Sequence, residues 1–321
     1  MIRTLIDRVA RPVGFGIISG ILALPPVAHA GDAGPRAPRP KGLARDAIVR
    51  HLPDDGCLPL PPPRSRIPWE PGERLSYDID VVGAQAGKLA LVALPTVGSG
   101  RSAEHPFRAL AASNSFFSKI RRVRGRSTSY VRARDWQPRR YEEASTEGAI
   151  RKAATVIFKR PDEGRRVEVD YQRNQARRKY RYGFLHQAFD PVSAVYYLRN
   201  LEFEKGMPIC FDAYAIRKLW RVRGEVKGLE TVKVPAGVFQ AWHLQGEAVR
   251  TDDPDARREV HIWISADERR LPLAALGVID LGGVRAQLTH VDRGSATDSE
   301  NDLVVEEPAA AAVEAKTPAV D

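Results

Sequence analysis

The sequence predicts a mainly β protein: one strongly bent antiparallel sheet, forming an open barrel or a sandwich-like fold, with one short helix packed on it. Apolar and polar residues alternate in many short segments, as they do in strands with one buried face. Short breaks rich in glycine, proline and aspartate separate these segments, and such connections join antiparallel neighbours. These observations favour a single β domain over residues 69–294.

The domain opens with a strand at residues 74–82. Leu75 and Tyr77 fall on one face of that strand, while Ser76 and Asp78 fall on the other. The same kind of reasoning predicts the other strands: 88–94, 107–113, 127–131, 139–145, 154–159, 165–171, 209–211, 219–226, 231–234, 242–249, 260–265 and 284–291.

Residues 190–200 have the pattern of a short helix. Asp190 stands where an N-cap residue accepts the free backbone N–H groups of the first turn, and Pro191 follows at the first helical position. One stripe of a short amphipathic helix has the spacing i, i+3, i+4 and i+7, and comprises Val192, Val195, Tyr196 and Arg199. Because most of the surrounding chain has strand patterns, we expect this helix to pack on the sheet.

The first thirty residues have the organisation of a signal peptide. Three arginines precede an apolar run over residues 13–27, and an Ala-His-Ala sequence ends at Ala30. A membrane anchor is the alternative, but the run is shorter than the roughly 20 residues that a span needs. We therefore expect an exported, periplasmic protein that is cleaved after about Ala30 and is not integral to the membrane.

The regions that flank the domain have different compositions. Residues 31–68 are rich in proline and arginine, which predicts an extended linker. Residues 295–321 are acidic and rich in alanine, which predicts a disordered tail. Cys57 and Cys210 are the two cysteines of the chain, and in an oxidising compartment we expect them to form a disulfide. Two free buried thiols are the alternative.

The formal net charge of +10 raises the question of an anionic partner. Export argues against nucleic acid, so a lipid surface is the better match, although a coding bias toward arginine also explains the charge. The densest basic run is the candidate for an anionic membrane surface, with a solvated sheet face as the alternative. It comprises Lys119, Arg121, Arg122, Arg124 and Arg126.

The sequence contains no motif that indicates catalysis. It has no nucleophile elbow, phosphate loop or paired metal-ligand spacing, and its histidines are scattered. We therefore expect no metal, no cofactor and no enzyme activity. A hydrolase whose residues come together only in the folded protein is the alternative.

Several fragments, in order along the chain, carry a resemblance to a known family. From about residue 69 to residue 291, the sequence resembles the exported bacterial family called domain of unknown function 3108. The fragments are GERLSYD at 72–78, PRRY at 138–141, DPVSAVYYLR at 190–199, VPAGVF at 234–239, IWIS at 262–265 and RRLP at 269–272. The resemblance implies an exported β-rich domain whose bent sheet surrounds a cavity.

Four residues are candidates for binding a ligand in such a cavity. Arg199 can hold a phosphate or carboxylate through two hydrogen bonds, and Tyr197 lies beside it on the helix. Asp190 and Trp263 complete the set. The alternatives are structural: the charges of Asp190 and Arg199 suit the two ends of the helix, and Trp263 packs in the core. The leading hypothesis is a non-enzymatic periplasmic protein that binds an apolar or amphiphilic, lipid-like ligand in envelope assembly. The alternative is a protein–protein interaction module with a filled core.

Overall fold

The computed structural model describes residues 56–215, 217–279 and 282–293. The predicted signal peptide, most of the predicted linker and the predicted tail lie outside these residues. The strands are β1 (Arg74–Val81), β2 (Ala84–Ala93), β3 (Glu104–Ser113), β4 (Val123–Arg132), β5 (Pro138–Glu147), β6 (Ile150–Phe158), β7 (Arg166–Arg173), β8 (Ala176–Gly183), β9 (Ala188–Phe189), β10 (Pro208–Ala215), β11 (Lys218–Val234), β12 (Gly237–Arg250), β13 (Asp253–Ser265), β14 (Pro272–Ile279) and β15 (Gly282–Asp292). The helices are α1 (Ser115–Arg121) and α2 (Pro191–Arg199).

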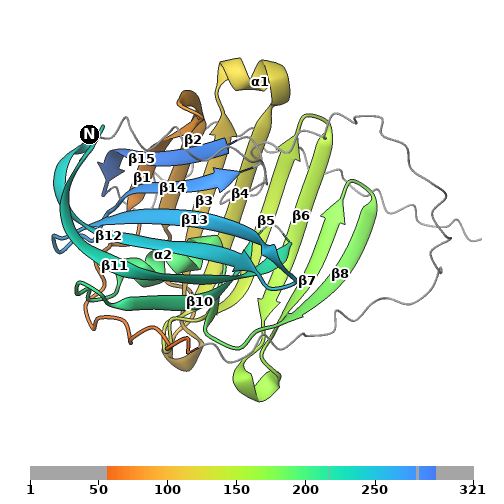
Figure 1. The fold of residues 1–321 in the computed structure, drawn as a ribbon. Coiled ribbons are helices and arrows are strands. Elements are labelled where there is room, and N and C mark those ends of the chain that lie inside the picture. The colour runs from red at the N-terminus through yellow and green to blue at the C-terminus, as the bar shows by residue number, and fades with distance from the viewer. Residues whose placement is uncertain (1–55, 216, 280–281, 294–321) are drawn as a thin grey trace, which may run out of the picture.

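Within the described residues, fifteen strands form one sheet, in the order β8-β7-β6-β5-β4-β3-β2-β1-β15-β14-β13-β12-β11-β10-β9. Consecutive strands pair antiparallel from β1 to β8 and from β10 to β15, β1 also pairs antiparallel with β15, and the short β9 pairs parallel with β10. The sheet bends strongly, so that β10–β13 lie in front of β3–β5 with α2 between the two parts (Figure 1). α2 contacts β3 and β4 on one side and β9 and β10 on the other.

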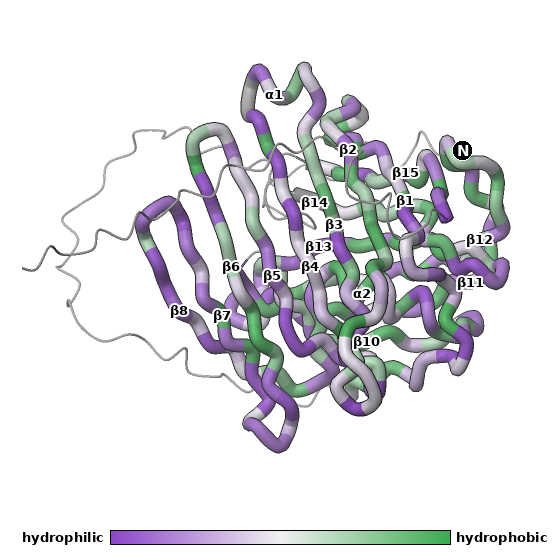
Figure 2. Tube along the Cα trace, turned by 180° about the vertical axis from the view of Figure 1, so that it is seen from behind, coloured by the Kyte–Doolittle hydropathy of each residue, from purple (hydrophilic) through white to green (hydrophobic). Residues whose placement is uncertain are grey.

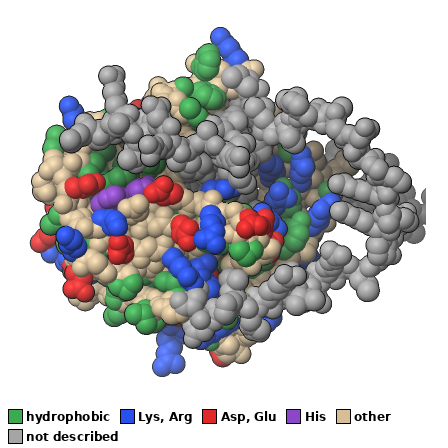
Figure 3. All heavy atoms as spheres, in the orientation of Figure 1, with side chains coloured by type: hydrophobic (Ala, Val, Ile, Leu, Met, Phe, Trp, Pro, Cys, Tyr) green, Lys and Arg blue, Asp and Glu red, His purple; other side chains and the backbone are tan. Residues whose placement is uncertain are grey.

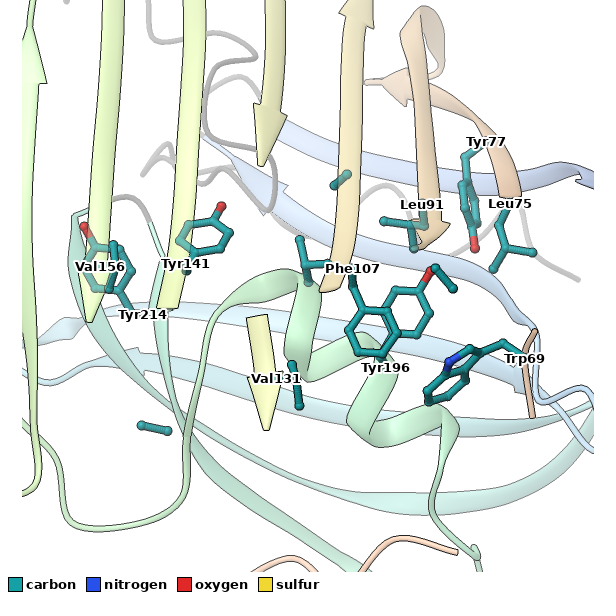
Figure 4. Packing of buried hydrophobic residues seen from close by; sticks show 14 of the residues in the cluster. Trp69, Leu75, Tyr77, Leu91, Phe107, Val131, Tyr141, Val156, Tyr196 and Tyr214 are labelled. Carbon is teal, nitrogen blue, oxygen red and sulfur yellow. The ribbon is translucent and has the colours of Figure 1, made fainter. Parts of the chain in front are cut away.

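Aromatic side chains fill the space between α2 and the sheet. Tyr196 of α2 stacks on Phe107 of β3 with ring centroids 3.8 Å apart, and Trp69 packs edge-on to Tyr196 at 5.1 Å (Figure 4). On the other side of the helix, Tyr197 packs against Phe189 at 4.8 Å. The sheet and α2 therefore enclose a packed interior at this position, and hydrophobic burial there holds the helix in place.

The predicted fold class is confirmed: the described chain is mainly β, and α2 occupies the predicted helix. Four elements were not predicted from the sequence, namely α1, β8, β9 and β14. The predicted strands 219–226 and 231–234 are one strand, β11, with an irregularity between Val226 and Gly228 where it pairs with β12.

The basic run does not lie on one strand. Asn114 caps α1 by accepting a hydrogen bond from the backbone N–H of Phe117 at 2.9 Å, so the chain turns into a helix there. Lys119 and Arg121 consequently belong to α1 and Arg122 follows its end, while Arg124 and Arg126 lie on β4. Only the last two share a strand face, so the five residues do not form one basic face of a strand.

Residues 56–68, which precede β1, form an extended segment that we call the strap. Cys57 and Cys210 form a disulfide, with Cα atoms 5.6 Å apart, which agrees with the predicted pairing. The backbone N–H of Arg64 donates to the carbonyl of Asn200 at 2.8 Å, and Leu60 is buried. The strap therefore joins β10 to the end of α2.

In the described part of the chain, no helix combines the length and the apolar character that a membrane span requires.

Candidate ligand pocket beside the buried helix

Asp190 is fully buried and caps α2. Its Oδ1 accepts hydrogen bonds from the backbone N–H groups of Val192 and Ser193, both at 3.0 Å. Its Oδ2 accepts from the hydroxyl of Ser129 on β4 at 2.6 Å and from the hydroxyl of Ser193 at 2.8 Å. Burial raises the pKa of the Asp190 carboxyl, and these donors oppose the rise. The carboxylate thus ties the start of the helix to the sheet.

We expect Asp190→Ala to lower the free energy of unfolding by about 2 kcal/mol, measured by urea denaturation. The lost cap accounts for roughly 1 kcal/mol. The hydroxyl of Ser129, which then lacks its acceptor in the interior, accounts for about the same again. Ser129→Ala removes only the bond to β4 and should cost about 1 kcal/mol. Equal losses in the two variants would contradict the capping role.

Arg199 is fully buried at the other end of α2, and all three of its guanidinium nitrogens donate hydrogen bonds. Nη1 and Nη2 reach the carboxylate of Glu73 at 2.7 and 3.2 Å. Nε donates to the carbonyl of Arg270 at 3.0 Å, and Nη2 also donates to the carbonyl of Arg269 at 3.2 Å. Burial opposes the charge of Arg199, but the carboxylate of Glu73 raises the pKa of its guanidinium above the ordinary value.

Three of the sequence fragments that carry the family resemblance meet at this guanidinium. Glu73 comes from GERLSYD, Arg199 from the helix and Arg269 from RRLP. Arg199 was a predicted candidate, but Glu73, which is buried just before β1, was not. In the sequence, Glu73 stands out only as a glutamate directly before an apolar strand. Nothing in the neighbouring residues indicates a partner 126 residues away. These contacts give Arg199 a structural role.

Tyr197 is also held by structural contacts. Its side chain is buried, and its hydroxyl donates to the carbonyl of Pro61 in the strap at 3.1 Å. The same hydroxyl accepts from the side-chain amide of Gln187 at 3.2 Å. Tyr197 therefore fixes the strap to α2.

Trp263 lies apart from the other three candidates, on β13. Its ring stacks on that of His243 with centroids 4.8 Å apart, and His243 in turn hydrogen-bonds His261 at 2.9 Å. The indole N–H of Trp263 donates to Glu230. The face of the molecule in Figure 3 shows histidine side chains between acidic ones. Asp190 and Arg199 thus lie at opposite ends of α2, and Tyr197 lies between them on the helix. Trp263 belongs to a separate cluster with His243 and His261.

A pocket of about 290 Å³ lies directly beside Arg199. The strap, the connection between β13 and β14 and the end of β15 form its walls. Trp69, Glu73 and Arg269 line the pocket and also contact Arg199, whose guanidinium is centred 5.2 Å from the Trp69 ring. We call this the strap pocket. Its remaining lining residues are Arg64, Arg66, Ile67, Pro68, Glu70, Glu268, Val291 and Arg293.

The lining of the strap pocket combines positive charge with apolar surface. Its four arginines face three glutamates, and Arg199 already pairs with one of these, Glu73. Arg66 and Glu268 approach to 3.6 Å while both side chains are 82% exposed, so their pairing is weak. Arg66 is therefore able to turn toward a ligand, and a guanidinium can hold a phosphate or carboxylate through two hydrogen bonds.

The described residues contain no group of three or more histidine, cysteine, aspartate or glutamate side chains that could hold a metal ion. The strap pocket is lined by charged side chains and by the apolar side chains of Ile67, Trp69 and Val291. The chemistry that the strap pocket offers is accordingly the binding of an anionic group next to an apolar surface.

Residues 76–289 match the model of a family described as protein of unknown function, DUF3108. No curated protein matches the chain. Among solved structures, the chain is similar to a β-barrel-like protein of domain of unknown function DUF1849 from Brucella abortus, with 9% identity, a TM-score of 0.49 and coverage of 71% of this chain and 99% of that one.

Two further solved structures are similar over comparable lengths. One is described as an exported protein with a YmcC-like fold from Bacteroides fragilis, with 9% identity, a TM-score of 0.33 and coverage of 70% and 98% of the two chains. The other is described as a lipoprotein from Parabacteroides distasonis, with 7% identity, a TM-score of 0.33 and coverage of 70% and 97%.

Proposed function

The chain belongs to the DUF3108 family of proteins of unknown function, and we propose that it is an exported, non-enzymatic binding protein of the cell envelope that holds an anionic amphiphile in the strap pocket. The observation that carries this proposal is the lining of the pocket. Arginine side chains stand beside Ile67, Trp69 and Val291. An amphiphile has the same two parts, a charged head group and an apolar chain.

The size of the pocket limits how such a ligand binds. A volume of about 290 Å³ is at the lower end of the roughly 300–1,000 Å³ of small-molecule sites. The interior behind the pocket is packed, because Trp69, Tyr196 and Phe107 stack against one another there. The pocket accordingly receives the head group and the nearest carbons, and the rest of the chain stays at the surface.

Titration of the mature protein with dioctanoyl phosphatidylglycerol, below its micellar concentration, tests the proposal. We expect saturable binding that weakens at least tenfold in the double variant Arg66→Glu/Arg269→Glu, because both arginines line the pocket. Arg257→Glu is the matched control, since Arg257 is 60% exposed on β13 and does not line the pocket. Its binding should equal that of the wild type.

The proposal also predicts the order of affinities of three related ligands. Glycerol 3-phosphate supplies the charge alone and octyl glucoside the apolar chain alone, so each should bind more weakly than the phosphatidylglycerol. Equal binding of the phosphatidylglycerol by the wild type and the double variant would contradict the proposal.

A second candidate function is a protein–protein interaction module of the envelope. The packed interior around α2 favours it, as does the edge of the sheet: within the described chain, β8 pairs with β7 alone. A strand at an edge offers its backbone to a partner strand. Crosslinking from β8 in intact cells distinguishes the candidates, because a stoichiometric protein adduct there favours the module.

A further inference from the structure

The outer surface of β3–β8 carries a groove of about 450 Å³, separate from the strap pocket. The strand register arranges its residues in rows that cross the strands. One row, from β3 to β7, contains Arg108, Thr128, Glu142, Thr155 and Asp170. The next row, from β4 to β8, contains Arg126, Ala144, Ala153, Gln172 and Arg177. The groove therefore runs across the strands.

Two alanines make the second row a trough. Ala144 and Ala153 are direct partners on β5 and β6, and both are exposed, so only methyl groups rise from the sheet there. Arg126 on β4 and Arg177 on β8 stand at its two ends. With strands roughly 4.8 Å apart, the four spacings between these ends give the trough a length of about 19 Å.

Positive charge surrounds this trough. The two carboxylates of the first row already form ion pairs. Glu142 pairs with Arg140 at 3.4 Å, and Asp170 pairs with Arg177 at 2.5 Å. Figure 2, which views the molecule from the side of these strands, shows that β7 and β8 are mostly hydrophilic. The basic residues of β3–β8 in or beside the two rows are Arg108, Arg124, Arg126, Arg140, Arg151, Arg177, Lys179 and Arg181.

We propose that the trough binds an acidic oligosaccharide that lies across the strands. Such a chain carries hydroxyls, which Thr155 and Gln172 can hydrogen-bond, and carboxylates, which Arg126 can hold. The backbone groups of β4–β7 are engaged in the sheet, so the side chains alone make contacts. An extended peptide would instead pair with the edge of the sheet. A flat lipid surface would meet the tips of the long side chains and leave the alanine floor uncovered.

Titration of the mature protein with tetragalacturonic acid tests this proposal, with the neutral maltotetraose as the comparison. We expect the acidic sugar to bind at low salt at least tenfold more tightly than the neutral one. Arg126→Gln should weaken that binding about tenfold, because it removes a charged hydrogen-bond donor. Ala144→Leu/Ala153→Leu should weaken it at least as much by filling the trough, without a change of charge.

Two variants control for general effects. Ala176→Leu also enlarges an exposed strand alanine, but on the opposite face of the sheet from Arg177, and Arg257→Gln removes an exposed arginine from β13. Both should bind tetragalacturonic acid as the wild type does. Undiminished binding by the Ala144→Leu/Ala153→Leu variant would overturn the proposal, as would the absence of any binding. Binding of phosphatidylglycerol vesicles that depends on Arg126 but not on the alanines would identify a membrane surface instead and would also overturn it.

Discussion

Arg199→Met is expected to lower the free energy of unfolding by about 3–5 kcal/mol. The substitution keeps much of the side-chain volume but removes the partner of Glu73, whose side chain is only 7% exposed. It also leaves the carbonyls of Arg269 and Arg270 without their donors. A buried charge and buried carbonyls without partners are costly, because they have lost hydrogen bonds to water. Urea denaturation followed by tryptophan fluorescence measures the loss.

Two further variants test the origin of this loss. In Arg199→Met/Glu73→Leu the buried charge is gone, so we expect part of the stability to return. Arg66→Met removes an exposed member of a surface pair and should change stability by less than about 0.5 kcal/mol. A loss below about 1 kcal/mol in Arg199→Met would contradict the role of this guanidinium as the centre of the buried network.

Removing the disulfide is expected to have a similarly large effect. Cys57 and Cys210 are separated by 153 residues, and the chain-entropy model assigns about 5 kcal/mol to the closure of so long a loop. We expect Cys57→Ala/Cys210→Ala to lose about 3–5 kcal/mol of unfolding free energy. The same loss should follow when the wild type is denatured in the presence of a reductant.

The rate of protease cleavage in the strap provides a second test of this prediction. Without the covalent link, the contacts of Leu60, Pro61 and Arg64 are left to hold the strap against α2 and β9–β10. Protease cleavage between residues 57 and 64 should accordingly become faster in the variant, while cleavage within the sheet stays slow. An unchanged denaturation midpoint after reduction would show that the disulfide does not stabilise the fold.

The fold could be predicted from the sequence where the local pattern is strong. The alternation in β1 and the Asp190-Pro191 start of α2 both encode the structure locally, and both are found as predicted. β8 escaped prediction because four of its eight residues are arginine or lysine, and α1 because its short sequence follows a strand without a clear break. In both cases the chain environment, rather than the local pattern, decides the conformation.

The candidate site could be predicted only in part. Arg199 and Tyr197 were named, but their hydrogen bonds to Glu73 and Pro61 span 126 and 136 residues. No spacing rule relates positions so far apart, so the strap pocket emerges only when the bent sheet brings the strap, the β13–β14 connection and β15 together. The second row of the trough has the same origin, because four successive strand registers together align Arg126 of β4 with Arg177 of β8.

Native mass spectrometry of the mature protein, isolated from its own cell envelope, tests the central claim most directly. The claim is that the strap pocket holds an anionic amphiphile. It predicts a stoichiometric adduct that solvent extraction identifies as an acidic lipid-like molecule, and that is lost in Arg66→Glu/Arg269→Glu but kept in Arg257→Glu. An unliganded mass for the wild type, or an adduct that persists in the double variant, would contradict the claim.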